Sequence, residues 1–370
     1  MMSFISNILK KKKTSALGID IGSSSIKVVQ LQKKGNKAIL ETYGELALGP
    51  YGGVSVGQST NLPVEKIVQA VNDILNEKEV AITTRTCGMA IPFKASLLSI
   101  IQMPDIGKKE MDSMIPIEAR KYIPVPISDV TLDWSVIPKS EVVEDTPGTN
   151  TGKSKVKTVD ILLVAIHNNI INQYKEVVSK TSLDAKFFEI EVFSSMRAIL
   201  EGVQGPIMIF DMGASTTKLY IVDRGLVQSS HTINKGSQDI TANISRVLNV
   251  STEDAEVIKR SVGMGKTVDG TDLSETVLVV ADSIFSEANR FLFEFQKKRN
   301  KNIKSVFLTG GGSALKGFRD LSAQNFKVKV ISGDPFEKVE TPAFLEEILK
   351  VTGPEFTVAV GAALRCLGEI

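Results

Sequence analysis

The chain is poor in the side chains that build metal centres and nucleophilic triads. Its 370 residues include two cysteines, two histidines and one tryptophan. Cys87 and Cys366 stand far apart in the sequence, so we expect neither a zinc cluster nor a disulfide framework, and a reducing compartment suits them. His167 and His231 offer little material for a zinc site or a Ser-His-Asp triad. A functional site in this chain is therefore expected to use backbone, hydroxyl and carboxylate groups.

Long apolar runs and an excess of one charge are also missing. Apolar runs such as 161–166 are too short to span a bilayer. A net charge of +2, from 44 Lys+Arg against 42 Asp+Glu, provides no general field that would hold nucleic acid. A hydrophobic fraction of 42% is that of a globular protein, and 370 residues exceed one ordinary compact core. We expect two lobes or more and no nucleic-acid partner.

Charge is biased in one place, the N-terminal tail at 1–13. Phe4, Ile5, Ile8 and Leu9 lie there ahead of an unbroken run of lysines, Lys10 to Lys13. This pattern is typical of a short amphipathic membrane anchor with a basic end, and it is equally compatible with a solvated tail. The continuous apolar stretch and cleavage site of a signal peptide are lacking. Both interpretations stay open on the sequence.

The strongest pattern is an internal repeat. Its copies run from Ala16 to Leu31 and from Ile207 to Val222. Each predicts a buried strand, a tight turn and a second strand, with Asp-x-Gly and small or hydroxylated residues at the turn. In both copies a lysine follows the aspartate by seven positions, as Asp20 with Lys27 and as Asp211 with Lys218. The repeat predicts two similar lobes, one in each half of the chain.

Apolar spacing predicts the remaining elements. Helices are predicted at 63–77, 108–122, 237–248, 252–261, 275–299 and 356–366. Strands are predicted at 130–137, 156–166 and 302–309, with a mobile polar loop at 141–157. The segment 123–127 is extended, because a residue before proline avoids the helical region. Pro116 interrupts the second helix or marks its first turn. The apolar stripe of Phe285, Leu292 and Phe295 predicts core.

The repeated turns are suited to binding a polyphosphate. Glycine followed by hydroxyl residues offers backbone N–H groups at close range, and two such turns facing each other would hold phosphates from both sides. Asp20 and Asp211, at the ends of their strands, would face the same anion. Because carboxylates do not face phosphates favourably without a cation between them, the pattern predicts Mg²⁺, held largely through water. The glycines at 310–312 follow a predicted buried strand and would let a flat base approach the backbone.

These motifs resemble the phosphate-1, phosphate-2 and adenosine motifs of the superfamily of actin, heat-shock chaperones and sugar kinases. Within it, the chain resembles the PilM family, cytoplasmic actin-like ATPases of type IV pilus assembly, over nearly its whole length. Specific to that branch are Tyr-Ile-Pro-Val-Pro from Tyr122 and Leu-Asp-Trp ending at Trp134. The resemblance implies an α/β, actin-like two-lobed ATPase fold of duplicated ribonuclease H-like lobes with an inserted 1C-type subdomain.

The resemblance also implies a division into subdomains. After the tail at 1–13, the first-lobe core (1A) takes 14–98 and 158–204, around the inserted subdomain (1C) at 99–157. The second-lobe core (2A) takes 205–235 and 302–370, including a closing helix, around subdomain 2B at 236–301.

The resemblance assigns roles to individual residues. The phosphates contact the first turn at Gly22, Ser23, Ser24, Ser25 and Lys27 and the second at Gly213, Ala214, Ser215 and Thr216. Gly310, Gly311, Gly312 and Ser313 back the adenosine, Glu256 and Lys259 reach its ribose and base, and Gly236 belongs to the loop that enters the upper second lobe. Asp20 and Asp211 are the metal and catalytic carboxylates, and Glu189 or Glu191 orients the attacking water, although either glutamate is also compatible with a purely structural role. Glu256 and Lys259 are equally compatible with a solvated salt bridge. No Walker lysine motif is present, so any hydrolysis is expected to depend on metal and positioning and to be slow.

The implied cofactors are ATP and Mg²⁺, and the implied partner is the cytoplasmic N-terminal peptide of a PilN-like inner-membrane protein. ATP would set the angle between the lobes and so the shape presented to partners. The implied location is the cytoplasm, peripheral at the inner membrane, with other pilus platform proteins and membrane contact through the tail as further interactions. Two alternatives remain: an FtsA-like filament or cell-division protein, and an adaptor that binds ATP without turnover. A sugar kinase is not favoured, because no sugar-binding signature is visible.

We expect the inserted subdomain to hold the partner peptide. The proline-locked segment 123–127 and the aromatic Trp134 would form one wall of a groove for an extended peptide. Trp134 is also compatible with a core position, in which case Tyr122 and Val125 would line the groove.

Overall fold

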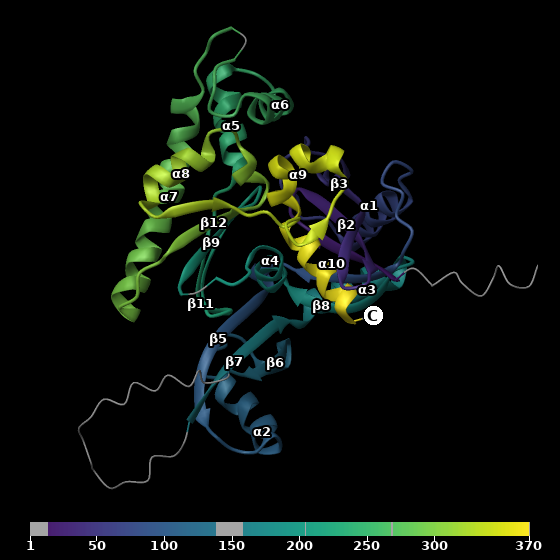
Figure 1. Cartoon of the computed structure of the whole chain (residues 1–370), viewed down its shortest axis with the longest axis vertical. Helices are drawn as coiled ribbons and strands as arrows, with labels where there is room; N and C mark the ends of the chain where they lie inside the picture. The colour runs from purple at the N-terminus through teal and green to yellow at the C-terminus, as the bar shows by residue number, and fades with distance from the viewer. Residues whose placement is uncertain (1–13, 138–157, 204, 268, 370) are drawn as a thin grey trace, which may run out of the picture. The chain divides into compact units, whose positions relative to one another are not determined.

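The computed structural model describes residues 14–137, 158–203, 205–267 and 269–369. The chain separates into two compact units, one formed by the residues up to Pro92 and from Glu176 onward, and the other by Phe93–Lys175. Figure 1 shows the elements of both. The tail at 1–13 and the loop at 141–157 lie outside the described residues. The finer subdomain boundaries stay a prediction.

The larger unit contains two β-sheets. The first sheet consists of β1 (Thr14–Ile21), β2 (Ser25–Lys34), β3 (Lys37–Ala47), β4 (Thr86–Ile91), β8 (Asp184–Ile190) and β14 (Val339–Glu340), in the order β14-β3-β2-β1-β4-β8. The second consists of β9 (Ile207–Met212), β10 (Thr217–Asp223), β11 (Leu226–Ile233), β12 (Ser305–Thr309) and β13 (Lys329–Ser332), in the order β11-β10-β9-β12-β13.

The two sheets follow one plan. β1 and β9 each pair antiparallel with the next strand in the chain, which in turn pairs antiparallel with a third. On their other side, β1 and β9 each pair parallel with β4 or β12, and a further parallel strand follows. Five strands of one sheet thus correspond to five of the other in order and direction. The predicted duplication into two similar lobes is confirmed.

Most of the described α-helices lie where apolar spacing predicts them. The predicted helices are α1 (Val64–Asn76), α2 (Lys108–Ala119) of the smaller unit, α5 (Ser237–Leu248), α6 (Thr252–Val262), α7 (Ser274–Arg299) and α10 (Thr357–Glu369). The others are α3 (Asn168–Lys180), α4 (Glu191–Ile199), α8 (Phe318–Phe326) and α9 (Glu346–Thr352). No described helix is long and apolar enough to cross a membrane.

The two lobes are packed by different means. In the second, Phe285 of α7 stacks on Phe318 with ring centroids 5.5 Å apart, in a core that includes Leu292 and Phe295 as predicted. In the first, α10 lies directly on β1, since a Cβ at Gly18 would fall 1.9 Å from the carbonyl oxygen of Ala359. The last helix of the chain therefore completes the first lobe.

In its described residues, the smaller unit contains a three-stranded antiparallel sheet and the helix α2, together with the first part of α3. Its strands β5 (Ser96–Pro104), β6 (Val130–Val136) and β7 (Thr158–His167) lie in the order β5-β7-β6. The helix α2 (Lys108–Ala119) runs through Pro116, so the prediction that Pro116 interrupts it or marks its first turn is wrong. The burial of Met111 and Ile115 against the sheet offsets the hydrogen bond that proline removes.

Candidate functional site

The two predicted turns have the same local geometry. In the first, the amide of Gly22 donates to the carbonyl of Ser25 at 3.0 Å, and in the second the amide of Gly213 donates to that of Thr216 at 2.9 Å. The register also matches, with Asp20 opposite Lys27 on β1 and β2 and Asp211 opposite Lys218 on β9 and β10. The repeat in sequence is therefore a repeat of two hairpins.

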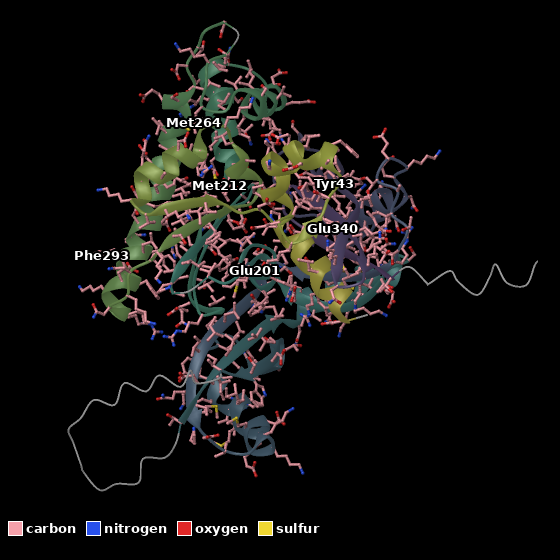
Figure 2. All side chains as sticks on the ribbon, in the orientation of Figure 1. Tyr43, Glu201, Met212, Met264, Phe293 and Glu340 are labelled. Carbon is pink, nitrogen blue, oxygen red and sulfur yellow. The ribbon has the colours of Figure 1, made fainter. Side chains whose placement is uncertain are left out.

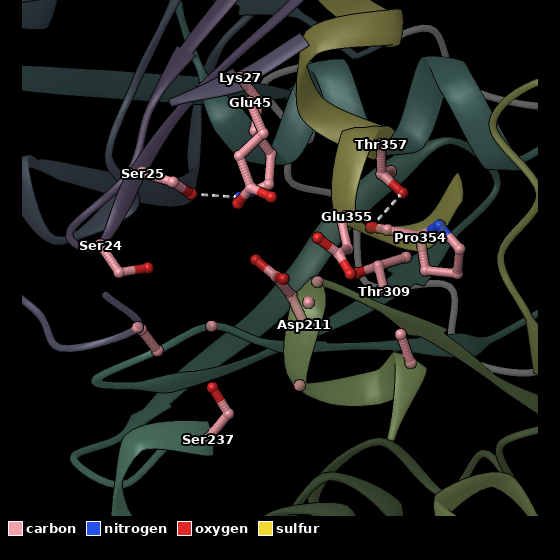
Figure 3. A pocket seen from close by; sticks show the side chains of 18 of the residues that line it. Ser24, Ser25, Lys27, Glu45, Asp211, Ser237, Thr309, Pro354, Glu355 and Thr357 are labelled. Carbon is pink, nitrogen blue, oxygen red and sulfur yellow. Dashed lines mark hydrogen bonds and ion pairs between the residues drawn. The ribbon is translucent and has the colours of Figure 1, made fainter. Parts of the chain in front are cut away.

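The two turns meet at one cavity of about 310 Å³, within the range of small-molecule sites. The hydroxyl oxygens of Ser23 and Ser215, one from each turn, lie 3.3 Å apart. Figure 3 shows Ser24, Asp211 and Ser237 pointing into a common space. The predicted residues that line the cavity are Asp20, Gly22, Ser23, Ser24, Ser25, Lys27, Glu191, Asp211, Gly213, Ala214, Thr216, Glu256, Lys259, Gly310, Gly311 and Gly312.

Three further predicted residues support the lining without belonging to it. Ser215 lies in the second turn, with its hydroxyl next to that of Ser23 in the first turn. Gly236 packs on that turn, since its Cβ would lie 2.4 Å from the Ala214 oxygen, and the next amide, of Ser237, donates to Gly213 at 2.9 Å. The Ser313 hydroxyl donates to the carbonyl of Gly310 at 2.7 Å. Gly236 and Ser313 thus shape the backbone around the cavity.

The structure separates the two carboxylates proposed to orient water. Glu189 does not line the cavity; its oxygens accept from Ser194, Arg197 and Arg365 at 2.6–3.0 Å. Burial alone would raise the pKa of Glu189, but these donors outweigh it and lower the pKa. Glu191, two residues on and at the start of α4, lines the cavity and pairs with Lys218 at 2.7 Å. Of the two carboxylates, Glu191 is therefore the one that lines the cavity.

Carboxylates converge at the ends of β1 and β9. Burial, aided by the charges of Glu191 and Asp211, raises the pKa of Asp20 to about 6 despite the nearby ammonium groups of Lys27 and Lys218. Lys218 lies 3.6 Å from Asp211. The site therefore holds several negative charges at close quarters, with ammonium groups as their counter-ions.

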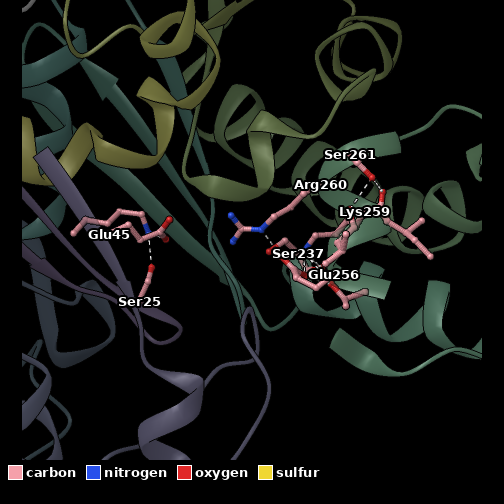
Figure 4. Close-up of polar contacts among 11 residues, drawn as sticks. Ser25, Glu45, Ser237, Glu256, Lys259, Arg260 and Ser261 are labelled. Atoms are coloured by element: carbon pink, nitrogen blue, oxygen red, sulfur yellow. Dashed lines mark hydrogen bonds and ion pairs between the residues drawn. The ribbon is translucent and has the colours of Figure 1, made fainter. Parts of the chain in front are cut away.

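The Glu256–Lys259 pair of α6 is buried, so the solvated-face alternative does not describe it. Its ionic distance is 2.6 Å, and the Thr241 hydroxyl contacts both residues. Arg260 also donates to Glu256 at 2.8 Å and points toward Glu45 of the first lobe, as Figure 4 shows. A Cβ at Gly57, also in the first lobe, would lie 2.6 Å from the Glu256 carboxyl carbon. The pair therefore sits where the two lobes approach.

The glycine-rich segment after β12 adopts a conformation that needs glycine. Gly310 has φ +80°, and a Cβ there would fall 2.4 Å from the Asp211 carboxylate. Just before it, the hydroxyl of Thr309 is buried at the cavity and has no hydrogen-bond partner among the described residues. Such a group is available to a ligand.

Several cavity residues escaped sequence reasoning. Glu45, Arg260, Thr309 and Glu355 line the cavity from four different elements or loops, and no local pattern marks them. Lys218 carried a signal, because it repeats the position of Lys27 in the first hairpin. Burial raises the pKa of Glu355, and the neighbouring Glu45 adds to the effect.

The charge of the cavity bears on what it can hold. Six carboxylates face four cationic side chains in the lining, which leaves two negative charges; they are Asp20, Glu45, Glu191, Asp211, Glu256 and Glu355 against Lys27, Lys218, Lys259 and Arg260. Among the described residues, no three His, Cys, Asp or Glu side chains are arranged to enclose a metal ion. The donor set fits a cation such as Mg²⁺, which binds proteins through one or two carboxylates, water and substrate phosphates.

Comparison with known proteins extends these observations. The sequence pattern of the family described as type IV pilus assembly protein PilM matches residues 18–367. A solved PilM–PilN type IV pilus biogenesis complex is similar with a TM-score of 0.77 and 26% identity, covering 95% of this chain and 98% of that one. The ethanolamine utilization protein EutJ of Carboxydothermus hydrogenoformans shares the fold, with a TM-score of 0.51 and 16% identity over 95% of this chain and 89% of its own.

Cell-division proteins are also similar. FtsA of Neisseria meningitidis serogroup B is 24% identical over 336 residues, which are 81% of this chain and 80% of that protein. The predicted actin-like two-lobed fold is confirmed. Because the PilM pattern covers nearly the whole chain, the chain belongs to the family of type IV pilus assembly protein PilM.

Proposed function

We propose that the cavity binds ATP together with Mg²⁺ and that the bound nucleotide sets the shape that this pilus assembly protein presents to its partners. One observation carries the proposal: two hairpin turns of identical register face each other, with Ser23 and Ser215 hydroxyls 3.3 Å apart. A polyphosphate between them would meet backbone amides and hydroxyls from both lobes. Closure around it would then couple nucleotide state to the relation of the two lobes.

The roles of the residues follow from their places. Asp20 and Asp211 would hold the ion through water, and the ion would supply charge neutralisation for the phosphates. Glycines 310–312 would let the base approach the backbone, and Thr309 would give its free hydroxyl to the ligand. Glu256 and Lys259, already fixed by Thr241, would meet the ribose and base.

We propose weak ATP hydrolysis, with Glu191 as the residue that orients the water. Its carboxylate is in the cavity, but it is bound to Lys218 at 2.7 Å, so it is not free to accept a proton without a rearrangement. Slow turnover, or binding without useful turnover, is consistent with that pairing.

The test is ligand-dependent stability of the purified protein. Mg-ATP at a hundred times its dissociation constant adds about 2.7 kcal/mol to the folded state, which gives a visible thermal shift. Asp211→Ala should reduce the shift without unfolding the ligand-free protein, whereas Asp282→Ala, on the exposed side of α7, should leave it unchanged. A shift of equal size with ATP in EDTA would remove metal bridging from the proposal.

We further propose that the unit Phe93–Lys175 binds the cytoplasmic N-terminal peptide of a PilN-like protein, at the cytoplasmic face of the inner membrane. The similar solved structure is a PilM–PilN complex, which supports such a partner. In this unit Trp134 is half-buried at the margin of the core and lines a surface cavity of about 500 Å³ with Ile106, Met111 and Val136. β6 lies at the edge of its sheet beside this cavity, which suits an extended peptide.

A matched pair of variants tests this partner site. Val136→Glu places a charge at the cavity on a side chain already 44% exposed, so the fold should tolerate it. Val247→Glu does the same on α5, where the side chain is 53% exposed. We expect the first to weaken binding of a synthetic PilN N-terminal peptide at least tenfold and the second to leave it unchanged. Equal binding by both variants would place the peptide elsewhere.

A further inference from the structure

Lys218 stands among carboxylates in the cavity. Its ammonium lies 2.7 Å from a Glu191 oxygen and 3.6 Å from an Asp211 oxygen, and it interacts electrostatically with Asp20 as well. Its side chain is 18% exposed, so bulk water screens these interactions little. One lysine therefore faces three carboxylates, an arrangement otherwise typical of a bound metal ion.

The symmetry-related lysine has a different set of partners. Lys27, at the same position of the first hairpin, pairs with Glu45 at 3.1 Å and donates to the Ser25 hydroxyl at 2.6 Å. It thus binds one carboxylate of the neighbouring strand β3, whereas Lys218 binds carboxylates from α4 and β9. The two hairpins share a backbone plan, but only the second places its ammonium in direct contact with one of the two aspartates.

We propose that Lys218 is a resident cation of the phosphate site and takes over part of the neutralising role of a divalent metal, so that the cavity admits a nucleotide polyphosphate without Mg²⁺. This rests on the proposed nucleotide site. The cavity carries two net negative charges with Lys218 present and would carry three without it. A tethered ammonium costs no separate binding step, so it neutralises Asp211 and Glu191 before any ligand arrives. Lys218 acts as a positioning residue through these carboxylates.

The experiment is calorimetric titration of ATP into the full chain, once with Mg²⁺ and once with EDTA. In the unaltered protein we expect the dissociation constant in EDTA to be about tenfold higher than with Mg²⁺, because Lys218 takes over only part of the metal's role. Removing one unit charge at a distance of about 4 Å lowers the affinity for ATP by several powers of ten at most in a site of intermediate dielectric constant. Partial relaxation of the surrounding side chains makes this loss of affinity smaller. We therefore expect Lys218→Met to lose about a further hundredfold of affinity in EDTA and little with Mg²⁺, since the metal replaces the missing charge.

Three further variants serve as controls for the ATP titration of Lys218→Met. Lys218→Arg should restore metal-free binding, and Lys235→Met, an exposed lysine of the same lobe that does not line the cavity, should not change it. The double variant K218M/E191Q removes an ammonium and a carboxylate together, so it should recover most of the metal-free affinity, while a direct lysine–phosphate contact predicts no recovery. Circular dichroism of each variant reports its folding.

The outcomes separate this inference from the proposed function. If the unaltered protein binds ATP with Mg²⁺ but not in EDTA, or if Lys218→Met leaves the ratio of the two constants unchanged, Lys218 is not a resident cation. Failure of recovery in the double variant also overturns it. If the unaltered protein binds no nucleotide under either condition, the proposed function itself fails.

Discussion

Glu189 and Glu191 are two residues apart, and the structure predicts losses of stability of very different size when each is neutralised. Glu189→Gln keeps the shape of a buried side chain but removes the charge that Arg197 and Arg365 share. Arg365 in addition lies over the Phe187 ring at 3.9 Å, so the network ties β8, α4 and α10 together. The amide of glutamine can accept only part of these hydrogen bonds and brings a donor of its own that faces cationic groups.

The size of the stability loss in Glu189→Gln depends on how deeply Glu189 and its two arginine partners are buried. Breaking a buried ion pair by removing one partner costs about 3–5 kcal/mol. The Glu189 side chain is only 4% exposed, but the arginines are 32% and 34% exposed and can turn partly to water. We therefore expect Glu189→Gln to lower the free energy of unfolding by about 2–3 kcal/mol. Glu191→Gln, which relaxes a crowded set of carboxylates, should cost much less.

Urea unfolding at pH 7, followed by circular dichroism, measures this difference. The pKa of Glu189 is lowered in the folded state, so its contribution is present above the ordinary value of 4.5 and lost as pH falls through the lower folded value. The gap between the unaltered protein and Glu189→Gln should accordingly shrink below about pH 4. If Glu189→Gln is as stable as the unaltered protein, or if Glu191→Gln is the more damaging of the two, the ion pairs of Glu189 do not stabilise the fold in this way.

Further predictions concern other parts of the molecule. Asp20→Asn should stabilise the ligand-free protein at pH 7 by about 1–3 kcal/mol, because burial raises the pKa of Asp20 to about 6 and the ionised form is the costly one. That gain should shrink as pH falls through about 6, where the folded aspartate takes up its proton, and should be lost near pH 4, where the aspartate of the unfolded chain is protonated as well; a gain independent of pH would contradict it. Gly18→Ala should lower the melting temperature, since its methyl group would meet the Ala359 oxygen, whereas Gly368→Ala, with open space around it, should not. Deleting residues 1–13 should reduce sedimentation with anionic vesicles, as should added salt; unchanged binding would favour the solvated tail.

The sequence predicts the fold well because its main signals are local. Each hairpin turn lies between apolar strands, and the repeat of Asp-x-Gly with a lysine seven residues later marks both copies. Long helices such as α7 are predicted to within one residue, because the apolar spacing persists over many turns. The prediction that Pro116 interrupts α2 or marks its first turn was wrong, because the burial of neighbouring side chains outweighs the local cost of proline.

The cavity residues that belong to the two hairpin turns could be predicted from the sequence, whereas those brought to the cavity by tertiary contacts could not. The two turns, Asp20 and Asp211 could be named from their residues. By contrast, the choice between Glu189 and Glu191 depends on two arginines, one of them 176 residues away in the chain. Glu45, Arg260 and Glu355 reach the cavity only through the packing of the lobes, so no spacing in the sequence marks them.

A crystal structure of the protein grown with Mg²⁺ and a non-hydrolysable ATP analogue tests the central proposal most directly. We expect the triphosphate between the turns Gly22–Ser25 and Gly213–Thr216, with the ion near Asp20 and Asp211 and the base beside Gly310–Gly312. Nucleotide bound elsewhere, or an empty cavity at saturating nucleotide with the turns accessible to solvent, would contradict it.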